Sequence, residues 1–127
     1  MPGRISSKEL YESGEDYLEA ILMLREENGR VYAIDIAKHL DVSKASVSKA
    51  LSRLEERGYL AVNGRDIALS EAGAAVAERI LRRHRFFTEF LISAGVDPEV
   101  AEEEACHIEH AVSEDSFEKI AATYGCS

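Results

Sequence analysis

Apolar side chains recur every three or four positions over most of the chain, which is the spacing of helices with one buried face. Residues 7–28 show it clearly, with Leu18 and Ile21 in the apolar stripe. Ser13 and Asp16 have the spacing of a capping box, so the regular part of this helix is expected to begin near Ser13. Further helices are predicted over residues 34–40, 44–57, 71–93, 98–113 and 116–124.

A two-stranded hairpin is predicted between the third and fourth helices. Two short runs with strand character, 59–62 and 65–69, flank Asn63-Gly64, and this dipeptide is a strong hairpin-turn signal. Helix, short helix, tight turn, helix and hairpin follow one another in the order of a winged helix-turn-helix. The fold class is therefore mainly α, with an N-terminal winged helix-turn-helix over 1–72, a two-stranded β wing, and a helical domain over 73–127.

Charge is unevenly distributed along the chain. The net charge is −9, but residues 30–65 carry seven basic and four acidic side chains, whereas residues 97–127 carry one basic and nine acidic ones. A basic face can meet DNA phosphates while the remaining surface stays acidic. A helical bundle with a solvated basic face would carry similar charges, but the order of the elements favours DNA binding.

The third helix supplies the candidate DNA contacts. Lys44, Ser46, Ser48 and Lys49 lie on its polar face, where hydroxyl and ammonium groups can enter a major groove and bond bases or phosphates. Arg65, at the hairpin tip, is expected to bind phosphate. The predicted partner is double-stranded DNA.

A candidate metal site lies in the acidic segment. Cys106, Glu109 and His110 stand at i, i+3 and i+4, so one helical face presents a thiolate, a carboxylate and an imidazole. These donors suit a divalent transition metal. Because three ligands from one helix do not fill a coordination sphere, other helices must contribute.

Four further residues are candidate ligands. His84 lies on the inner half of the long helix, Asp16 and Glu19 lie one turn apart on the first helix, and Glu102 lies one turn before Cys106. Each has an ordinary explanation alone, such as a capping carboxylate, a solvated charge or a core histidine. Their combination favours a metal site.

Several classes of function are disfavoured. No apolar run approaches the length of a membrane span, the N-terminus has no signal-peptide pattern, and two cysteines are too few for a disulfide framework. A cytoplasmic protein without a small organic substrate is expected. Di-metal carboxylate enzymes need paired Glu-x-x-His motifs, and only Glu104 and His107 have this spacing, so we expect no enzyme activity. A metal-independent winged-helix regulator stays open as an alternative.

The sequence resembles the diphtheria toxin repressor family of iron- and manganese-dependent regulators. The resemblance is carried by SGEDYLEAILML, IDIAKHLDVSKASVSKALSRLEERGYL, LSEAGAAVAERILRRHRFFTEFL, GVDPE and EEACHIEHAVS. It implies repression of metal-uptake genes by a protein that binds Mn(II) or Fe(II), with Zn(II), Co(II) or Ni(II) as substitutes. It also implies that the SH3-like domain of many iron-type relatives is absent.

The family comparison makes this ligand set mixed. Asp16, Glu19 and His84 match manganese-type members, whereas Cys106 matches iron-type members. Iron-type members use a second site, but Thr88 and Glu102 here do not match its pattern. A second site, if present, would use Glu19 with His84.

We hypothesise that the cation clamps the first helix to the later ones and fixes the spacing of two recognition helices in a homodimer on a palindromic operator. The dimer surface is expected on apolar faces after residue 70, including those of Phe86, Phe87, Phe90 and Leu91.

Overall fold

The computed structural model describes residues 7–125, with side chains described from Gly14 onward. The chain divides into two compact units, the first ending at Glu78 and the second beginning at Arg79. The division falls inside helix α4 (Glu71–Ser93). None of the described helices combines the length and apolar character needed to cross a bilayer.

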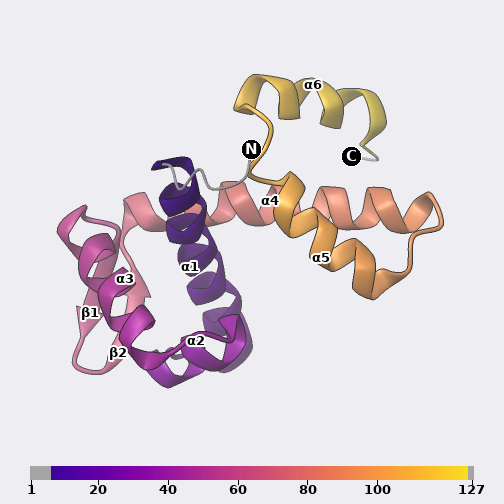
Figure 1. The fold of residues 1–127 in the computed structure, drawn as a ribbon. Helices are drawn as coiled ribbons and strands as arrows, with labels where there is room; N and C mark the ends of the chain where they lie inside the picture. The colour runs from indigo at the N-terminus through magenta and orange to yellow at the C-terminus, as the bar shows by residue number, and fades with distance from the viewer. Residues whose placement is uncertain (1–6, 126–127) are drawn as a thin grey trace. The chain divides into compact units, whose positions relative to one another are not determined.

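The first unit has the predicted order of elements (Figure 1). These are α1 (Ser7–Asn28), α2 (Ala33–Leu40), α3 (Lys44–Glu56), β1 (Leu60–Asn63), β2 (Asp66–Leu69) and the start of α4. The predicted bounds of α1, 7–28, are confirmed, whereas the expectation that its regular part begins near Ser13 is wrong because the chain is already helical from Ser7. The core of the unit draws on every one of these elements, and its fully buried members are Ile21, Val31, Ile36, Val47 and Ala77.

The turn between α2 and α3 fixes the direction of α3. Asp41 adopts φ 57°, in the left-handed region where α2 ends. Ser43 then caps α3 by accepting a hydrogen bond from the Ser46 backbone N–H at 3.1 Å. Ala37 and Val47 are buried where α2 and α3 meet the core. One face of α3 is therefore held on the core, and its polar face is left in solvent.

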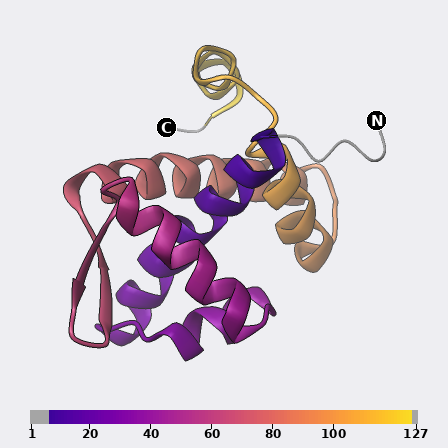
Figure 2. The ribbon, with the colours of Figure 1, turned by 60° about the vertical axis from the view of Figure 1, so that its left-hand side comes forward.

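The wing is a tight antiparallel hairpin, visible as a narrow ribbon in Figure 2. Asn63 pairs with Asp66, so the two-residue turn is Gly64-Arg65 and not the predicted Asn63-Gly64. Gly64 takes φ 65°, and positive φ at the first turn position is the pattern of a type II′ turn. Asp66 stays in the sheet because its carboxylate accepts from the Val31 backbone N–H at 3.0 Å.

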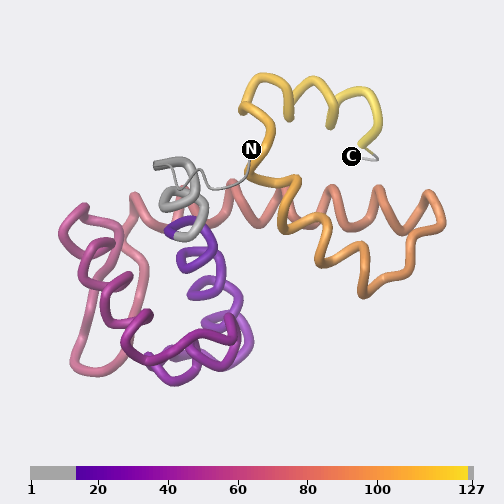
Figure 3. Tube along the Cα trace, viewed as in Figure 1, coloured from indigo at the N-terminus to yellow at the C-terminus, as the bar shows by residue number. Residues whose placement is uncertain are grey.

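The second unit contains the rest of α4, α5 (Pro98–Ile108) and α6 (Glu114–Tyr124). Figure 3 follows the chain as it reverses direction between α5 and α6. The predicted extension of α5 to Ser113 is wrong, because α5 ends at Ile108. Ser113 instead caps α6 by accepting from the Ser116 backbone N–H at 3.0 Å. Residues 109–113 therefore form the connection between the two helices.

Aromatic side chains build the core of the second unit. Phe117 is 1% exposed and meets the Phe86 ring edge-on, with centroids 5.6 Å apart. Phe87 and Ala105 are buried beside it. The expectation that Phe87 contributes to a dimer surface is wrong, since this ring is covered by its own unit. Phe90 remains 41% exposed.

Truncating Phe117 should destabilise the second unit strongly. Phe117→Ala removes a fully buried ring and leaves a cavity, so we expect a loss of about 3–5 kcal/mol in the free energy of unfolding. Urea titration of the metal-free protein, followed by circular dichroism, measures this loss. The control is Lys119→Ala, which removes an exposed i,i+4 ion pair with Asp115 worth about 0.5 kcal/mol or less. Equal effects of the two substitutions would contradict the packing described.

Candidate metal centre and DNA-binding face

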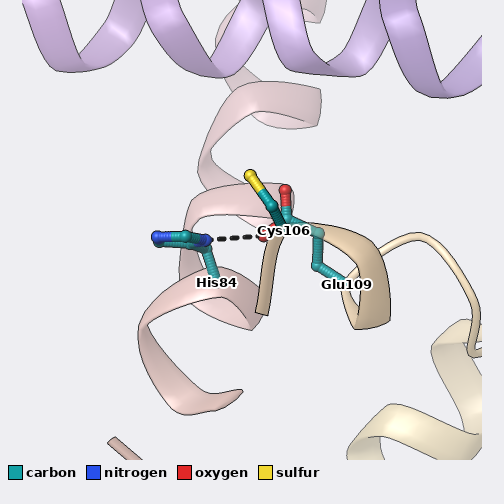
Figure 4. A group of neighbouring side chains, drawn as sticks. All are labelled: His84, Cys106 and Glu109. Atoms are coloured by element: carbon teal, nitrogen blue, oxygen red, sulfur yellow. Dashed lines mark hydrogen bonds and ion pairs between the residues drawn. The ribbon is translucent and has the colours of Figure 1, made fainter. Parts of the chain in front are cut away.

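Three potential metal ligands converge within the second unit. His84 projects from α4 and Cys106 from the last turn of α5, and Glu109 is the C-cap residue of α5. One nitrogen, sulfur or oxygen atom of each lies within 4.8 Å of the others. Figure 4 shows the three side chains gathered together between these helices. Glu109 keeps helical backbone angles, so it shares a face with Cys106 although the helix ends at Ile108.

Glu109 is the most deeply buried acid of the site. Its side chain has no exposed surface, and its Oε1 lies 2.9 Å from His84 Nδ1. Its Oε2 has no hydrogen-bond partner among the described residues, although His110 Nε2 lies 3.3 Å away. Burying a carboxylate oxygen costs free energy because the oxygen loses its hydration, and one imidazole nitrogen at 3.3 Å without a hydrogen bond offsets only part of that loss. This oxygen is therefore suited to bind a cation.

His84 lies between two carboxylates. Its Nδ1 faces Glu109, and its Nε2 lies 3.1 Å from Glu102 Oε1. Hydrogen bonding to Cys106, then to Glu109, raises the pKa of His84 to about 11, against the opposing effect of burial. The surrounding acidic groups thus favour a positive charge between Glu102 and Glu109, and the protonated His84 ring carries that charge when no metal ion is bound.

The donor set fits a divalent transition metal. Imidazole, thiolate and carboxylate are ligands for iron, zinc and related ions, and carboxylate also suits manganese. The His110 side chain is 3% exposed and lies beside Glu109, so a second imidazole is close to the buried oxygen. Cys106 is exposed, which leaves room for donors from elsewhere. His84, Cys106, Glu109 and His110 would hold the ion.

The other predicted ligands are placed differently. Asp16 and Glu19 lie one turn apart on α1, in the first unit; Asp16 is half-buried and Glu19 is 5% exposed. Glu102 is 65% exposed in its side chain and contacts the cluster through His84 Nε2. Thr88 is buried, and its hydroxyl has no hydrogen-bond partner among the described residues. Cys126 lies outside the described residues.

Within the first unit, α1 is directly linked to the predicted DNA-binding helix. Asp16 lines a hollow of about 410 Å³ together with Lys49 and Arg53 of α3. Tyr17 of α1 and Val47 of α3 are buried in the same hydrophobic core. Residues of α1 and α3 are therefore packed in one core, so the position of α3 depends on that of α1.

The predicted DNA contacts are exposed. Lys44, Ser46, Ser48 and Lys49 all lie on the solvent side of α3. Arg65 is exposed at the wing turn, with its guanidinium 6.0 Å from the centre of the Tyr32 ring.

The sequence interpretation missed two arginines. Arg30 lies 5.2 Å from the centre of the Tyr32 ring, so it adds a second positive charge near Arg65. Its position in the basic segment was the available signal. Arg83 is buried beside His84 and contacts the end of α5. The run Arg82-Arg83-His84-Arg85 contains it, but nothing in the run distinguishes a buried arginine from a solvated one.

Two protein-family models together match almost the whole chain. The iron-dependent repressor N-terminal DNA-binding domain matches residues 9–67, and the iron-dependent repressor metal-binding and dimerisation domain matches residues 70–126.

Individual proteins agree with these matches. The chain is 35% identical over 112 residues to an uncharacterised HTH-type transcriptional regulator of Methanocaldococcus jannaschii, covering 86% of this chain and 90% of that protein. It is 37% identical over 109 residues to the HTH-type transcriptional regulator MntR of Bacillus subtilis. The match covers 85% of this chain and 77% of that protein.

A solved manganese-dependent transcriptional repressor in complex with manganese is also similar. It superposes with a TM-score of 0.80 at 28% identity, covering 90% of this chain and 53% of that one. The chain thus spans about half the length of that structure. With both domains matched in order and relatives above one-third identity, the chain belongs to the diphtheria toxin repressor family of metal-dependent transcriptional regulators.

Proposed function

We propose that this protein is a homodimeric repressor of metal-uptake genes that binds a palindromic operator when it holds Mn(II) or Fe(II). DNA binding is assigned to residues 1–72, and dimerisation and metal binding to residues 73–127. The observation that carries the proposal is the buried Glu109 carboxylate, whose Oε2 has no hydrogen-bond partner among the described residues and which is grouped with potential metal ligands, His84, Cys106 and His110.

We further propose that Asp16 and Glu19 complete the ligand set. His84, Cys106, Glu109 and His110 supply nitrogen, sulfur and oxygen donors, and two carboxylates from α1 would add the oxygen donors that manganese and iron accept. Zn(II), Co(II) or Ni(II) would substitute, since their preferred ligands are present. Glu102 contacts His84 Nε2, so it orients the imidazole in the way that carboxylates orient metal-binding histidines.

A charge argument connects this ligand set to DNA binding. A bound divalent ion supplies positive charge and a coordination sphere that several carboxylates share. In the proposed site, the carboxylates of Asp16, Glu19 and Glu109 would repel one another without the ion, and this repulsion would disfavour the position of α1 that completes the ligand set. With the charges neutralised, α1 is held in one position, and α3 is fixed with it because the two helices share a core. The ion shifts this equilibrium only by its preference for the clamped form.

Palindromic recognition follows from the symmetry of a homodimer. Two copies of α3 would enter successive major grooves on one face of DNA, about 34 Å apart. Exposed apolar side chains in the second unit offer a surface for a second copy: Phe90, Ile92, Val100 and Tyr124. A two-fold axis between the copies would match inverted half-sites.

Lys49→Ala should weaken operator binding and reduce its dependence on salt. Lys49 is exposed on α3. Removing one phosphate contact from each protomer should make the negative slope of log K against log salt concentration shallower by about one per protomer. Fluorescence anisotropy at several salt concentrations measures both effects. Lys119→Ala, which removes an exposed lysine from α6, serves as the control and should leave both unchanged. An unaltered slope in Lys49→Ala would remove this residue from the DNA-binding face.

Selection from random DNA duplexes tests the proposed function. With Mn(II) present, we expect enrichment of inverted repeats whose half-site centres lie about one helical turn apart. The same selection with a chelator should enrich nothing. Enrichment of the same sites with the chelator would favour a metal-independent regulator, and no enrichment under either condition would contradict DNA recognition.

A further inference from the structure

Arg83 inserts a buried guanidinium group into the connection that follows α5. Its side chain is only 7% exposed. Its Nη1 donates to the main-chain carbonyls of Glu109 and Val112, at 2.9 and 2.8 Å. Its Nη2 donates to Glu114 Oε1 at 2.8 Å. One side chain of α4 therefore binds the end of α5, the connecting residues and the start of α6.

One of these contacts, to the Glu109 carbonyl, satisfies a group that the end of α5 leaves without a partner. The last carbonyls of an α-helix have no N–H partner within the helix, and they carry partial negative charge. The planar guanidinium donates to several acceptors at once with little loss of side-chain freedom for each bond. It also lies 5.3 Å from the centre of the Phe117 ring, which favours its charge. Residues 109–112 are thereby held against α4.

We infer that Arg83 is a positioning residue for the metal centre, an inference that rests on the proposed function. By binding the Glu109 carbonyl, it fixes the backbone from which the Glu109 carboxylate extends toward His84 and Cys106. The carboxylate is then in place before any ion binds, so the ordering of residues 109–112 does not reduce metal affinity. Arg83 does not bind the ion, since its charge is directed at the main-chain carbonyls and Glu114.

The adjacent Arg82 provides a matched control. Its guanidinium also joins α4 to α6, through hydrogen bonds to Glu118 at 2.8 and 3.3 Å and a position 5.0 Å from the centre of the Phe117 ring. The hydrogen bonds given by Arg82 go to α6, whereas Arg83 also bonds the Glu109 carbonyl. Replacing each arginine by methionine keeps similar apolar bulk and removes the guanidinium.

Cobalt titration of the full-length metal-free protein tests the inference. In the wild type, Co(II) should produce a near-ultraviolet thiolate-to-metal band from Cys106 together with visible bands that report coordination geometry. Arg83→Met should bind Co(II) about 10–100-fold more weakly and show altered visible bands, as is usual when the support of a metal ligand is lost. Arg82→Met should stay within about twofold of the wild type, with unaltered bands.

Hydrogen exchange of the metal-free protein provides a second readout. Amides of residues 109–113 should exchange faster in Arg83→Met and at the wild-type rate in Arg82→Met. Arg83→Lys, which keeps the charge but not the planar fork, should fall between the wild type and Arg83→Met in both measurements. This variant decides the question if Arg83→Met does not fold.

The outcomes separate the two claims. Cobalt affinity, bands and exchange in Arg83→Met equal to those of Arg82→Met would overturn the positioning role, and so would wild-type values for Arg83→Lys. A wild-type protein that binds no cobalt through Cys106 would instead contradict the proposed metal site. Hydrogen exchange would still show whether Arg83 holds residues 109–113.

Discussion

Glu109→Gln should abolish metal-dependent operator binding. The substitution keeps the shape of the side chain but removes the charge of a fully buried carboxylate, one oxygen of which has no hydrogen-bond partner in the described part of the chain. Loss of groups that merely support a ligand costs about 10–100-fold in metal affinity, so loss of the ligand itself should cost on the order of 100-fold or more. Mn(II) affinity by competition with a fluorescent chelator and operator affinity by anisotropy measure the two consequences.

Glu103→Gln is the control for this result. Glu103 lies on the same helix and is exposed. Its substitution changes the net charge by the same amount, so any effect of overall charge on DNA binding is shared by both variants. If the metal and operator affinities fell by the same factor in Glu109→Gln and Glu103→Gln, or fell in neither variant, Glu109 would not be a ligand of the metal centre.

Cys106→Glu should shift metal preference toward manganese. A thiolate is a soft ligand that favours iron, zinc and cobalt, whereas a carboxylate oxygen favours manganese. The position accommodates a longer side chain because Cys106 is exposed. We expect the ratio of Co(II) to Mn(II) affinity to fall on the order of tenfold, which corresponds to about 1.4 kcal/mol. Competition titrations with Mn(II), Co(II) and Zn(II), and with Fe(II) under anaerobic conditions, give the ranking.

Cys106→Ala separates ligand type from ligand loss. It removes the thiolate without adding an oxygen, so affinity should fall for every metal and should fall most for those that favour sulfur. An unchanged ranking in Cys106→Glu would mean that the thiol does not set metal choice, even if the other ligands are correct.

Local sequence signals predicted the elements of the first unit because the stabilising contacts are between near neighbours. Ser43 and Ser46 are three residues apart, and their hydrogen bond starts α3 as the capping pattern indicates. The turn at Asn63-Gly64 was misplaced by one residue, because contacts of Asp66 with Arg25 and Val31 hold it in the sheet. Those partners are distant in the sequence, and no local pattern contains them.

The residue types of the candidate metal centre were predictable, but its geometry was not. The spacing of Cys106 and Glu109 predicted one face of potential ligands, and the structure groups His84 of α4 with them. Glu109 caps α5, and its carbonyl accepts a hydrogen bond from Arg83, which is far away in the sequence. The burial of Phe87 likewise depends on packing with Phe117 of α6, which the periodicity of α4 does not reveal.

Operator affinity with and without metal tests the central claim most directly. The dissociation constant of the wild-type protein for a selected operator should be measured at one salt concentration, first with saturating Mn(II) and then with a chelator. A near-complete switch requires the ion to bind the DNA-binding form about 10⁴-fold more tightly than the other form. We therefore expect the dissociation constant for the operator to increase on chelation by a factor that approaches about 10⁴. Equal dissociation constants under the two conditions would contradict the claim that a divalent cation fixes the DNA-binding form.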